Sequence, residues 1–330
     1  MRVLSTFSGI GGFEVGIEHA LPGATLLAHN EINPWAARIY ETHLGGVNLR
    51  VAGDANETPD GALSTREFSR VHDITGVDFN RFNGCVDLLV GGPPCQDLSV
   101  GVVSHNRPEN VRGHMSRHGL DGERSGLFWQ FVRVIRETAP HHVLMENVAS
   151  MRPSDRDAIT AALRAVHPRI RDPVEINARL VTAQNRPRLF WATWDVVAPA
   201  GPGPELASVL ELTGPAMTPA AIALMDRYKG TRQRWYGGWT SFVSERKSKC
   251  VTRVWFKGVP YRTLVDDRSA PPIKRKFSLT EIERLQGFPD GWTAVAGASD
   301  TQRIAALGNA VSPPVVAAAM ASFPAHGLES

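Results

Sequence analysis

The chain has 330 residues, of which 42% are hydrophobic and 21% charged, with a formal net charge of +3. These ordinary globular values exclude a wholly disordered or collagen-like chain, and no apolar run approaches the ~20 residues of a membrane helix. Three cysteines (Cys85, Cys95 and Cys250) are too few for a disulfide framework or a zinc cluster, which favours a reducing cytoplasm.

Short apolar runs alternate with helical patterns along the first half of the chain. The runs predict strands at residues 3–7, 25–29, 49–52, 86–90 and 142–145. The patterns between them predict helices at residues 13–21, 35–43, 127–138 and 155–166. Two more strands are expected at 175–182 and 188–194. This alternation indicates an α/β fold with a mainly parallel, doubly wound sheet.

The composition changes after residue 195. Prolines and glycines across residues 199–219 predict a linker. Residues 226–276 then hold 14 Lys or Arg but only 4 Asp or Glu, whereas the rest of the chain holds 22 basic and 29 acidic residues. A basic block on an acidic body indicates a polyanion partner, and a merely solvated surface is the alternative.

Helical patterns return near the C-terminus. Ser278 and Glu281 have the spacing of a capping box, and Gly287 predicts the end of that helix. A last helix, rich in Ala and Val, is expected at 314–320.

The first candidate site is the sequence FSGIGG at residues 7–12, which follows the first strand at the sheet edge where ligands bind. Glu31, at the end of the second strand, is positioned to accept hydrogen bonds from ribose hydroxyls, and Asp54, after the third, to contact an adenine. Together they predict an adenosine-containing cofactor. The alternative is a glycine turn with two solvated acids.

Three further segments follow later strands. GGPPCQ, at residues 91–96, presents Cys95 in a stiff turn as a candidate nucleophile. ENV begins with Glu146, a candidate acid. QNRPR carries Arg186 and Arg188 at alternate positions, which point the same way on an extended segment and suit a carbonyl or a phosphate. The alternatives are an inert packing cysteine and a surface salt-bridge pair.

In this order, the segments resemble the motifs of the cytosine-C5 DNA methyltransferases, with RLQGFP (284–289) and LGNAV (307–311) as the last two. The resemblance assigns residues 1–195 and 274–330 to a catalytic domain of Rossmann-like methyltransferase fold that binds S-adenosylmethionine. It leaves 196–273 as a small basic target-recognition domain. Asp97-Leu98-Ser99 departs from the usual Phe-Ser and, with residues 122–129, is closer to the branch of the animal de novo enzymes. This departure puts the flanking-base preference in doubt.

The resemblance implies a DNA (cytosine-5-)-methyltransferase, which transfers a methyl group from S-adenosyl-L-methionine to C5 of a flipped-out cytosine in duplex DNA. Cys95 would form a covalent adduct at C6, Glu146 would hold N3 and the amine, and Arg188, with Arg186 alongside, would hold O2. The cofactor-binding residues are expected to be Phe7, Ser8, Gly9, Ile10, Gly11, Gly12, Glu31, Ile32, Asp54, Ala55, Gly91, Pro93, Leu127, Asn309, Ala310 and Val311. DNA contacts are expected from Gln96, Ser99, Arg124, Arg232, Arg234, Trp235 and Lys249, with Lys247 as a further phosphate contact.

Other functions remain open at this point. A tRNA cytosine-C5 methyltransferase and a catalytically inactive regulatory paralogue share the motifs, and a nicotinamide oxidoreductase shares only the glycine loop and Glu31. The expected partner is double-stranded DNA, with a companion restriction endonuclease in a restriction-modification system, and without a metal or a membrane. The chain is expected to be a monomer in the cytoplasm of a prokaryotic cell or phage-infected host, associated with the nucleoid when bound to DNA.

Overall fold

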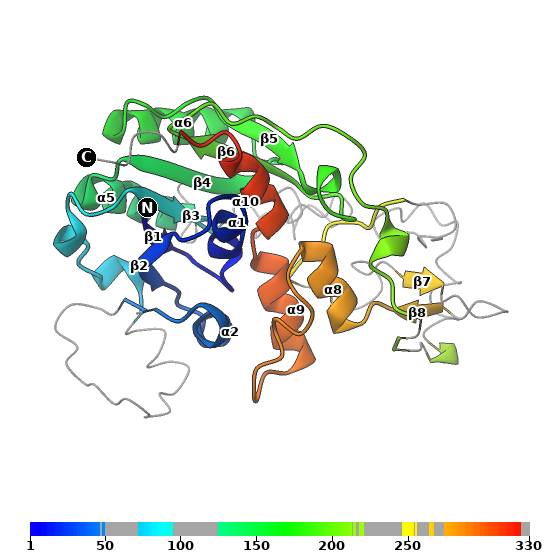
Figure 1. Cartoon of the computed structure of the whole chain (residues 1–330). Helices are drawn as coiled ribbons and strands as arrows, with labels where there is room; N and C mark the ends of the chain where they lie inside the picture. Colours follow the sequence, from blue (N-terminus) through cyan, green and yellow to red (C-terminus); the bar gives the residue numbers. More distant parts are fainter. Residues whose placement is uncertain are drawn as a thin grey trace, which may run out of the picture.

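The computed structural model describes residues 1–46, 48–49, 72–94, 125–212, 214–215, 218–220, 246–253, 255, 264–266 and 274–324. A six-stranded sheet in the order β2-β1-β3-β4-β6-β5 forms its centre (Figure 1). The strands are β1 (Arg2–Thr6), β2 (Thr25–Asn30), β3 (Leu88–Gly91), β4 (His142–Val148), β5 (Val174–Asn177) and β6 (Pro187–Ala192). Neighbours are parallel except that β6 runs antiparallel to both β4 and β5. The predicted α/β fold with a mainly parallel sheet is therefore confirmed.

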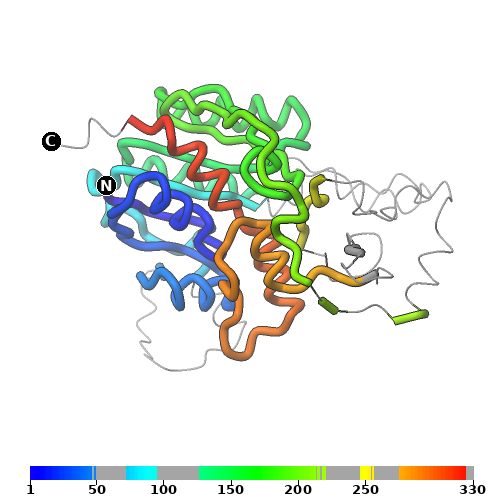
Figure 2. The backbone as a smooth tube through the Cα atoms, turned by 45° about the vertical axis from the view of Figure 1, so that its right-hand side comes forward, coloured from blue at the N-terminus to red at the C-terminus, as the bar shows by residue number. Residues whose placement is uncertain are grey.

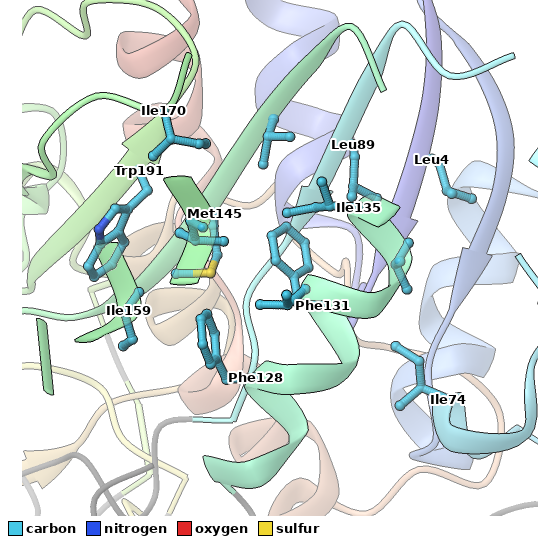
Figure 3. Packing of buried hydrophobic residues seen from close by; sticks show 14 of the residues in the cluster. Leu4, Ile74, Leu89, Phe128, Phe131, Ile135, Met145, Ile159, Ile170 and Trp191 are labelled. Carbon is cyan, nitrogen blue, oxygen red and sulfur yellow. The ribbon is translucent and has the colours of Figure 1, made fainter. Parts of the chain in front are cut away.

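Helices cover both faces of this sheet. On one face, α5 (Phe128–Thr138) and α6 (Pro153–Val166) belong to a cluster in which Phe128 and Phe131 point toward the side chains of Leu89 and Met145 (Figure 3). On the other face, α1 (Gly12–Ala20) packs against α10 (Pro313–Met320). The helix α10 is drawn in red in Figure 2. Burial of their apolar faces holds these helices against the sheet.

Among the described residues, the remaining α-helices are α2 (Pro34–Leu44), α8 (Leu279–Gln286) and α9 (Asp300–Asn309). Short 3₁₀ turns lie at η1 (Ile74–Gly76), η2 (Asn80–Phe82), η5 (Ser125–Leu127), η6 (Ala178–Leu180) and η7 (Leu206–Ser208). A two-stranded antiparallel sheet is formed by β7 (Leu264–Asp266) and β8 (Lys274–Lys276). The capping box of Ser278 and Glu281 is present, and Gly287 ends α8 in the left-handed conformation with a φ of 84°.

A third apolar cluster joins the C-terminal region to the glycine loop. Trp292 is 8% exposed and donates from its indole N–H to the carbonyl of Ile10 at 2.9 Å. Leu206 and Val209 are buried in the same cluster. The expected linker therefore contributes to the core, because these two apolar side chains lie among its prolines and glycines.

The structure differs from the sequence predictions at one strand and contains one helix that they lack, and one predicted strand lies almost entirely outside the described residues. The strand expected at 175–182 ends at Asn177, because the Asn177 side chain accepts from the backbone N–H of Arg179 and starts a 3₁₀ turn. Of the strand expected at 49–52, only Leu49 is described, and Asn48 before it forms an isolated bridge with His29. The helix α9, capped by Ser299 and Gln302, was not anticipated.

Candidate active site

The proposed cofactor loop leaves β1 and enters α1 through a tight, internally bonded turn. Phe7 and Gly9 have φ of 52° and 57°, and Gly11 has 88°. Ser8 is held by its backbone N–H and hydroxyl, which donate to the Asn30 carbonyl at 3.1 and 3.3 Å. Its side chain is buried, so this residue anchors the loop to the end of β2. A Cβ at Gly9 would meet no atom within 4 Å, so the opposite side of the loop is open.

Glu31 fixes the loop to the end of β2. Its two carboxylate oxygens accept from the backbone N–H groups of Gly9 at 2.8 Å and Asn33 at 2.7 Å. Burial raises the pKa of Glu31, although these two donors act in the opposite direction. Each oxygen retains a lone pair for another donor, such as a hydroxyl.

The surroundings of Glu31 fit an adenosine group. Ile32, the next residue, has an apolar side chain that is 44% exposed. Phe7 and Leu127 are only partly buried at the border of the core. Exposed apolar surface beside a hydrogen-bonded carboxylate matches a planar base joined to a ribose.

The C-terminal motif closes the other side of the loop. A Cβ at Gly12 would overlap the carbonyl oxygen of Val311, so only glycine permits this approach of the two backbones. Ala310 is buried and Asn309 is exposed. Residues 309–311 therefore lie against the glycine loop, although more than 290 positions separate them in the sequence.

The two central motifs meet at the carboxyl edge of the sheet. The Asn147 side chain donates to the carbonyl of Pro93 at 3.1 Å and fixes the start of the GGPPCQ turn. A Cβ at Gly92 would lie 3.3 Å from a carboxylate oxygen of Glu146. A Cβ at Gly91 would lie 2.6 Å from the Thr6 hydroxyl. The two glycines thus allow the turn to pass close to β1 and to Glu146.

Glu146 forms an ion pair with Arg188, whose Nε donates to the carboxylate at 2.8 Å. The side chains are only 12% and 15% exposed. Such a pair holds the carboxylate in one orientation, and Nη1 of the same guanidinium donates to the Pro187 carbonyl at 2.8 Å. This is the arrangement expected for a carboxylate that holds a base edge beside an arginine that holds a carbonyl.

Arg186 has different surroundings. It is 3% exposed, burial lowers its pKa, and its guanidinium donates to the backbone carbonyls of Val251 and Ala310, while the charges of Arg188 and Glu146 lie close enough to act on it. The nearby Cys250 was not singled out as a site residue from the sequence. Burial acts to raise the pKa of its thiol, but the guanidinium groups of Arg186 and Arg188 outweigh this and leave the pKa below its usual value.

Several predicted site residues lie outside the described part of the chain. They are Cys95, Asp54, Ala55, Gln96, Ser99, Arg124, Arg232, Arg234 and Trp235. Lys249 is described and exposed. Within the described ranges, no group of three His, Cys, Asp or Glu side chains is arranged to hold a metal ion. In the same ranges, no helix is long and apolar enough to cross a membrane.

A family model described as C-5 cytosine-specific DNA methylase matches residues 1–192 and 223–323. The chain belongs to this family. The resemblance found in the sequence and the expected enzyme class, DNA (cytosine-5-)-methyltransferase, are thereby confirmed. This C-5 cytosine-specific DNA methylase retains the motif glutamate and both motif arginines.

Individual relatives agree with the assignment. The Type II methyltransferase M1.ScrFI of Lactococcus lactis subsp. cremoris is 24% identical over 96% of this methylase and 76% of its own length. The Type II methyltransferase M.AplI of Arthrospira platensis is 28% identical over 99% of this methylase and 86% of its own length. Among solved structures, the Entamoeba histolytica methyltransferase EhMeth has a TM-score of 0.70 at 15% identity, covering 97% of this methylase and 96% of that chain. This last similarity concerns the fold alone.

Proposed function

We propose that this methylase transfers a methyl group from S-adenosylmethionine to C5 of a cytosine that is flipped out of duplex DNA. The observation that carries the proposal is the Glu146–Arg188 pair, held at the sheet edge beside the GGPPCQ turn. A flipped base offers N3, an exocyclic amine and O2 along one edge. A carboxylate and a guanidinium side by side match that edge.

The chemistry requires a nucleophile because C5 of cytosine is unreactive. The Cys95 thiolate adds to C6, and the ring becomes an enamine that is nucleophilic at C5. S-Adenosylmethionine supplies the methyl cation and leaves as S-adenosylhomocysteine. A base then removes the C5 proton, the C6–S bond breaks, and the thiolate is regenerated.

Glu146 and Arg188 stabilise the ring while charge develops on it. Glu146 accepts from the exocyclic amine, and from N3 once N3 takes up a proton as the thiolate adds, while Arg188 donates to O2 and fixes the carboxylate. Because the ion pair already exists in the structure, little reorganisation is needed when the base enters.

The cofactor is held by the glycine loop and its neighbours. Glu31 accepts from the ribose hydroxyls, Phe7, Ile32 and Leu127 provide apolar contact for the adenine, and residues 309–311 close the site from the C-terminal side. Asp54 and Ala55 complete the adenine contacts in this assignment, and Gly91 and Pro93 bring the GGPPCQ turn toward the methyl donor.

Residues 196–273 act as the target-recognition domain. Their basic block supplies phosphate contacts, and a few side chains read bases in the major groove. We propose further that the methylase acts as a monomer in the cytoplasm of a prokaryotic cell or phage-infected host. There it would protect DNA against a companion endonuclease, as the Type II names of its relatives suggest.

The test is methylation of purified duplex DNA and of tRNA with labelled S-adenosylmethionine, followed by bisulfite sequencing of the DNA. Methylated cytosines confined to one short sequence context are the expected result. Transfer to tRNA but not to DNA would support a tRNA cytosine-C5 methyltransferase instead. Cofactor binding without transfer to either would indicate an inactive regulatory paralogue.

A further inference from the structure

Arg186 joins two segments that are far apart in the sequence. On one side, its Nη1 donates to the Val251 carbonyl at 2.8 Å and lies 3.3 Å from the Cys250 sulfur. On the other side, its Nη2 donates to the carbonyls of Ala310 at 2.7 Å and Gly308 at 3.2 Å. One buried guanidinium therefore bridges the proposed target-recognition domain and the LGNAV motif.

The recognition-side segment, residues 248–253, is bound firmly to the QNRPR motif. The Ser248 N–H donates to the Ala183 carbonyl, and the Asn185 N–H donates to the Ser248 carbonyl, both at 2.8 Å. The Val251 N–H donates to the side-chain oxygen of Gln184 at 2.6 Å. Movement of this segment must therefore be transmitted to the backbone beside Arg186.

The cofactor-side segment, residues 307–311, is in equally close contact with its neighbours. A Cβ at Gly308 would overlap the backbone of Thr252 and Arg253, so the two segments touch directly. Val311, the last residue of the segment, lies against Gly12 of the glycine loop. The contacts form a continuous path from Val251 through Arg186 to Gly12.

Arg188, two residues along the chain, forms the ion pair with Glu146. The two arginines thus differ in their main partners, although both guanidinium groups act on the Cys250 thiol. A lysine at 186 would keep the charge but not the planar fork that reaches carbonyls on both sides.

We infer that Arg186 is a positioning residue that couples cofactor binding to the order of residues 248–253, rather than a group that touches the cytosine. This inference rests on the proposed function, since it assumes that the glycine loop and LGNAV hold the cofactor. Binding that fixes Gly12 and Val311 also fixes the segment from which the recognition domain extends. By reciprocity, DNA bound to that domain strengthens cofactor binding.

The experiment is backbone hydrogen exchange of the full chain, followed by mass spectrometry, with and without S-adenosylhomocysteine. In the wild type, the ligand slows exchange both in the glycine loop and in residues 248–251. In Arg186→Lys, protection of the glycine loop remains, protection of 248–251 is lost, and affinity for the ligand falls about tenfold. Arg133→Lys is the matched control, because this guanidinium donates to the Val77 and Ile74 carbonyls, away from both regions; both regions should stay protected.

Two results overturn the inference alone. One is a wild type that binds the ligand without protection of 248–251, and the other is Arg186→Lys with wild-type protection there. If Arg186→Lys does not fold, Cys250→Ala removes one partner of the Arg186 guanidinium, a thiol that also bonds to Arg188, and a partial loss of protection is expected. Unchanged protection in that variant contradicts the coupling. A wild type that does not bind S-adenosylhomocysteine overturns the proposed function and the inference with it.

Discussion

Arg188 donates to Glu146 at 2.8 Å from a strand that runs opposite to the strand of its partner. In the β4–β6 ladder, Arg188 lies opposite Val148, so the beginning of β6 meets the end of β4. Glu146 and Val148 share a face of β4, which places Arg188 diagonal to Glu146. A parallel β6 would carry the arginine to the far edge of the sheet. The reversal of this one strand is therefore what brings the two motifs together.

Glu146→Gln is expected to reduce turnover by about 100- to 10,000-fold while changing DNA affinity little. The amide keeps the shape and one acceptor but lacks the negative charge that pairs with Arg188 and stabilises the ring. Single-turnover methyl transfer and DNA binding, measured side by side, separate the two effects. Equal losses in rate and affinity would make Glu146 a recognition residue.

The matched control for this variant is Glu137→Gln. Glu137 pairs with Arg133 at 2.8 Å on α5 and is likewise mostly buried, at 19% exposure. Its replacement also removes the carboxylate of an ion pair, but away from the candidate site. Wild-type turnover in this control shows that loss of an ion pair as such does not abolish transfer.

Cys95→Ser is expected to abolish methyl transfer and to leave S-adenosylhomocysteine binding intact, because a hydroxyl is a far weaker nucleophile at neutral pH. Tritium incorporation into DNA and calorimetric titration of the ligand provide the two measurements. DNA containing 5-fluorocytosine should trap the wild type covalently, since its C5 substituent cannot leave as a proton. Retained transfer by the serine variant would remove Cys95 from the mechanism.

The sequence alone predicted the sheet, most helices and the motifs at its edge. These follow from local patterns: apolar strands, glycine turns, and polar residues at strand ends. The contacts of Arg186 and Arg188 show the limit of such patterns. Alternate positions on an extended segment predict that the two side chains point the same way. They do not predict the partners, because Glu146 lies 42 residues from Arg188, and the carbonyls bound by Arg186 lie more than 60 residues from it.

The sequence also did not predict the contacts between Trp292 and Ile10 and between Val251 and Gln184. The first depends on how the C-terminal region returns to the glycine loop and the second on how residues 248–253 return to the QNRPR motif, and no local periodicity encodes either. Residues 199–219 were predicted as a linker because proline and glycine dominate them. Leu206 and Val209 are buried because they pack against residues far away in the sequence, and the composition around them does not reveal this.

Gly12→Ala is expected to weaken the joint between the glycine loop and LGNAV. The added methyl would meet the Val311 carbonyl, which is backbone and cannot move aside cheaply. Overpacking of this kind costs about 1–3 kcal/mol. The melting temperature and the affinity for S-adenosylhomocysteine should both fall. At Gly126 a Cβ meets nothing within 4 Å, so Gly126→Ala is the control; an equal effect there would contradict the packing argument.

Glu14 should make a contribution to the stability of the chain that decreases with rising pH. Burial raises the pKa of this carboxyl above its usual 4.5, and the hydroxyls of Ser5 and Tyr40 offset this only in part. The folded chain therefore binds the proton more tightly than the unfolded chain does. This contribution to stability is complete below pH 4.5 and is lost as the pH rises through the raised pKa.

Glu14→Gln removes that titration while keeping a neutral side chain of the same shape. The variant should lose less stability than the wild type between about pH 5 and about pH 8. Melting temperatures across this range provide the measurement, and Glu175→Gln, at an exposed position on β5, is the control. Parallel pH profiles for Glu14→Gln and the wild type would show that Glu14 is ionised in the folded chain.

Lys247 and Lys249 should differ in their contribution to DNA binding, although the sequence predicted phosphate contacts for both. Lys247 donates to the backbone carbonyls of Arg179, Thr182 and Pro204, and burial lowers its pKa. Its ammonium group therefore ties residues 179–182 to residue 204. Lys249 is exposed in the same segment, where a phosphate can approach it.

Lys249→Ala should therefore flatten the dependence of DNA affinity on salt by about 0.9 in the slope of log K against log salt concentration, the value for one phosphate contact. Lys247→Ala should leave the slope unchanged and lower the melting temperature, because three carbonyls lose their donor. Neither variant should change the methylated sequence, since phosphate contacts carry no base information. Affinity titrations over a range of salt concentrations, combined with bisulfite mapping, test both expectations. A slope that responds to Lys247 but not to Lys249 would reverse the assignment and place the DNA backbone against residues 179–204.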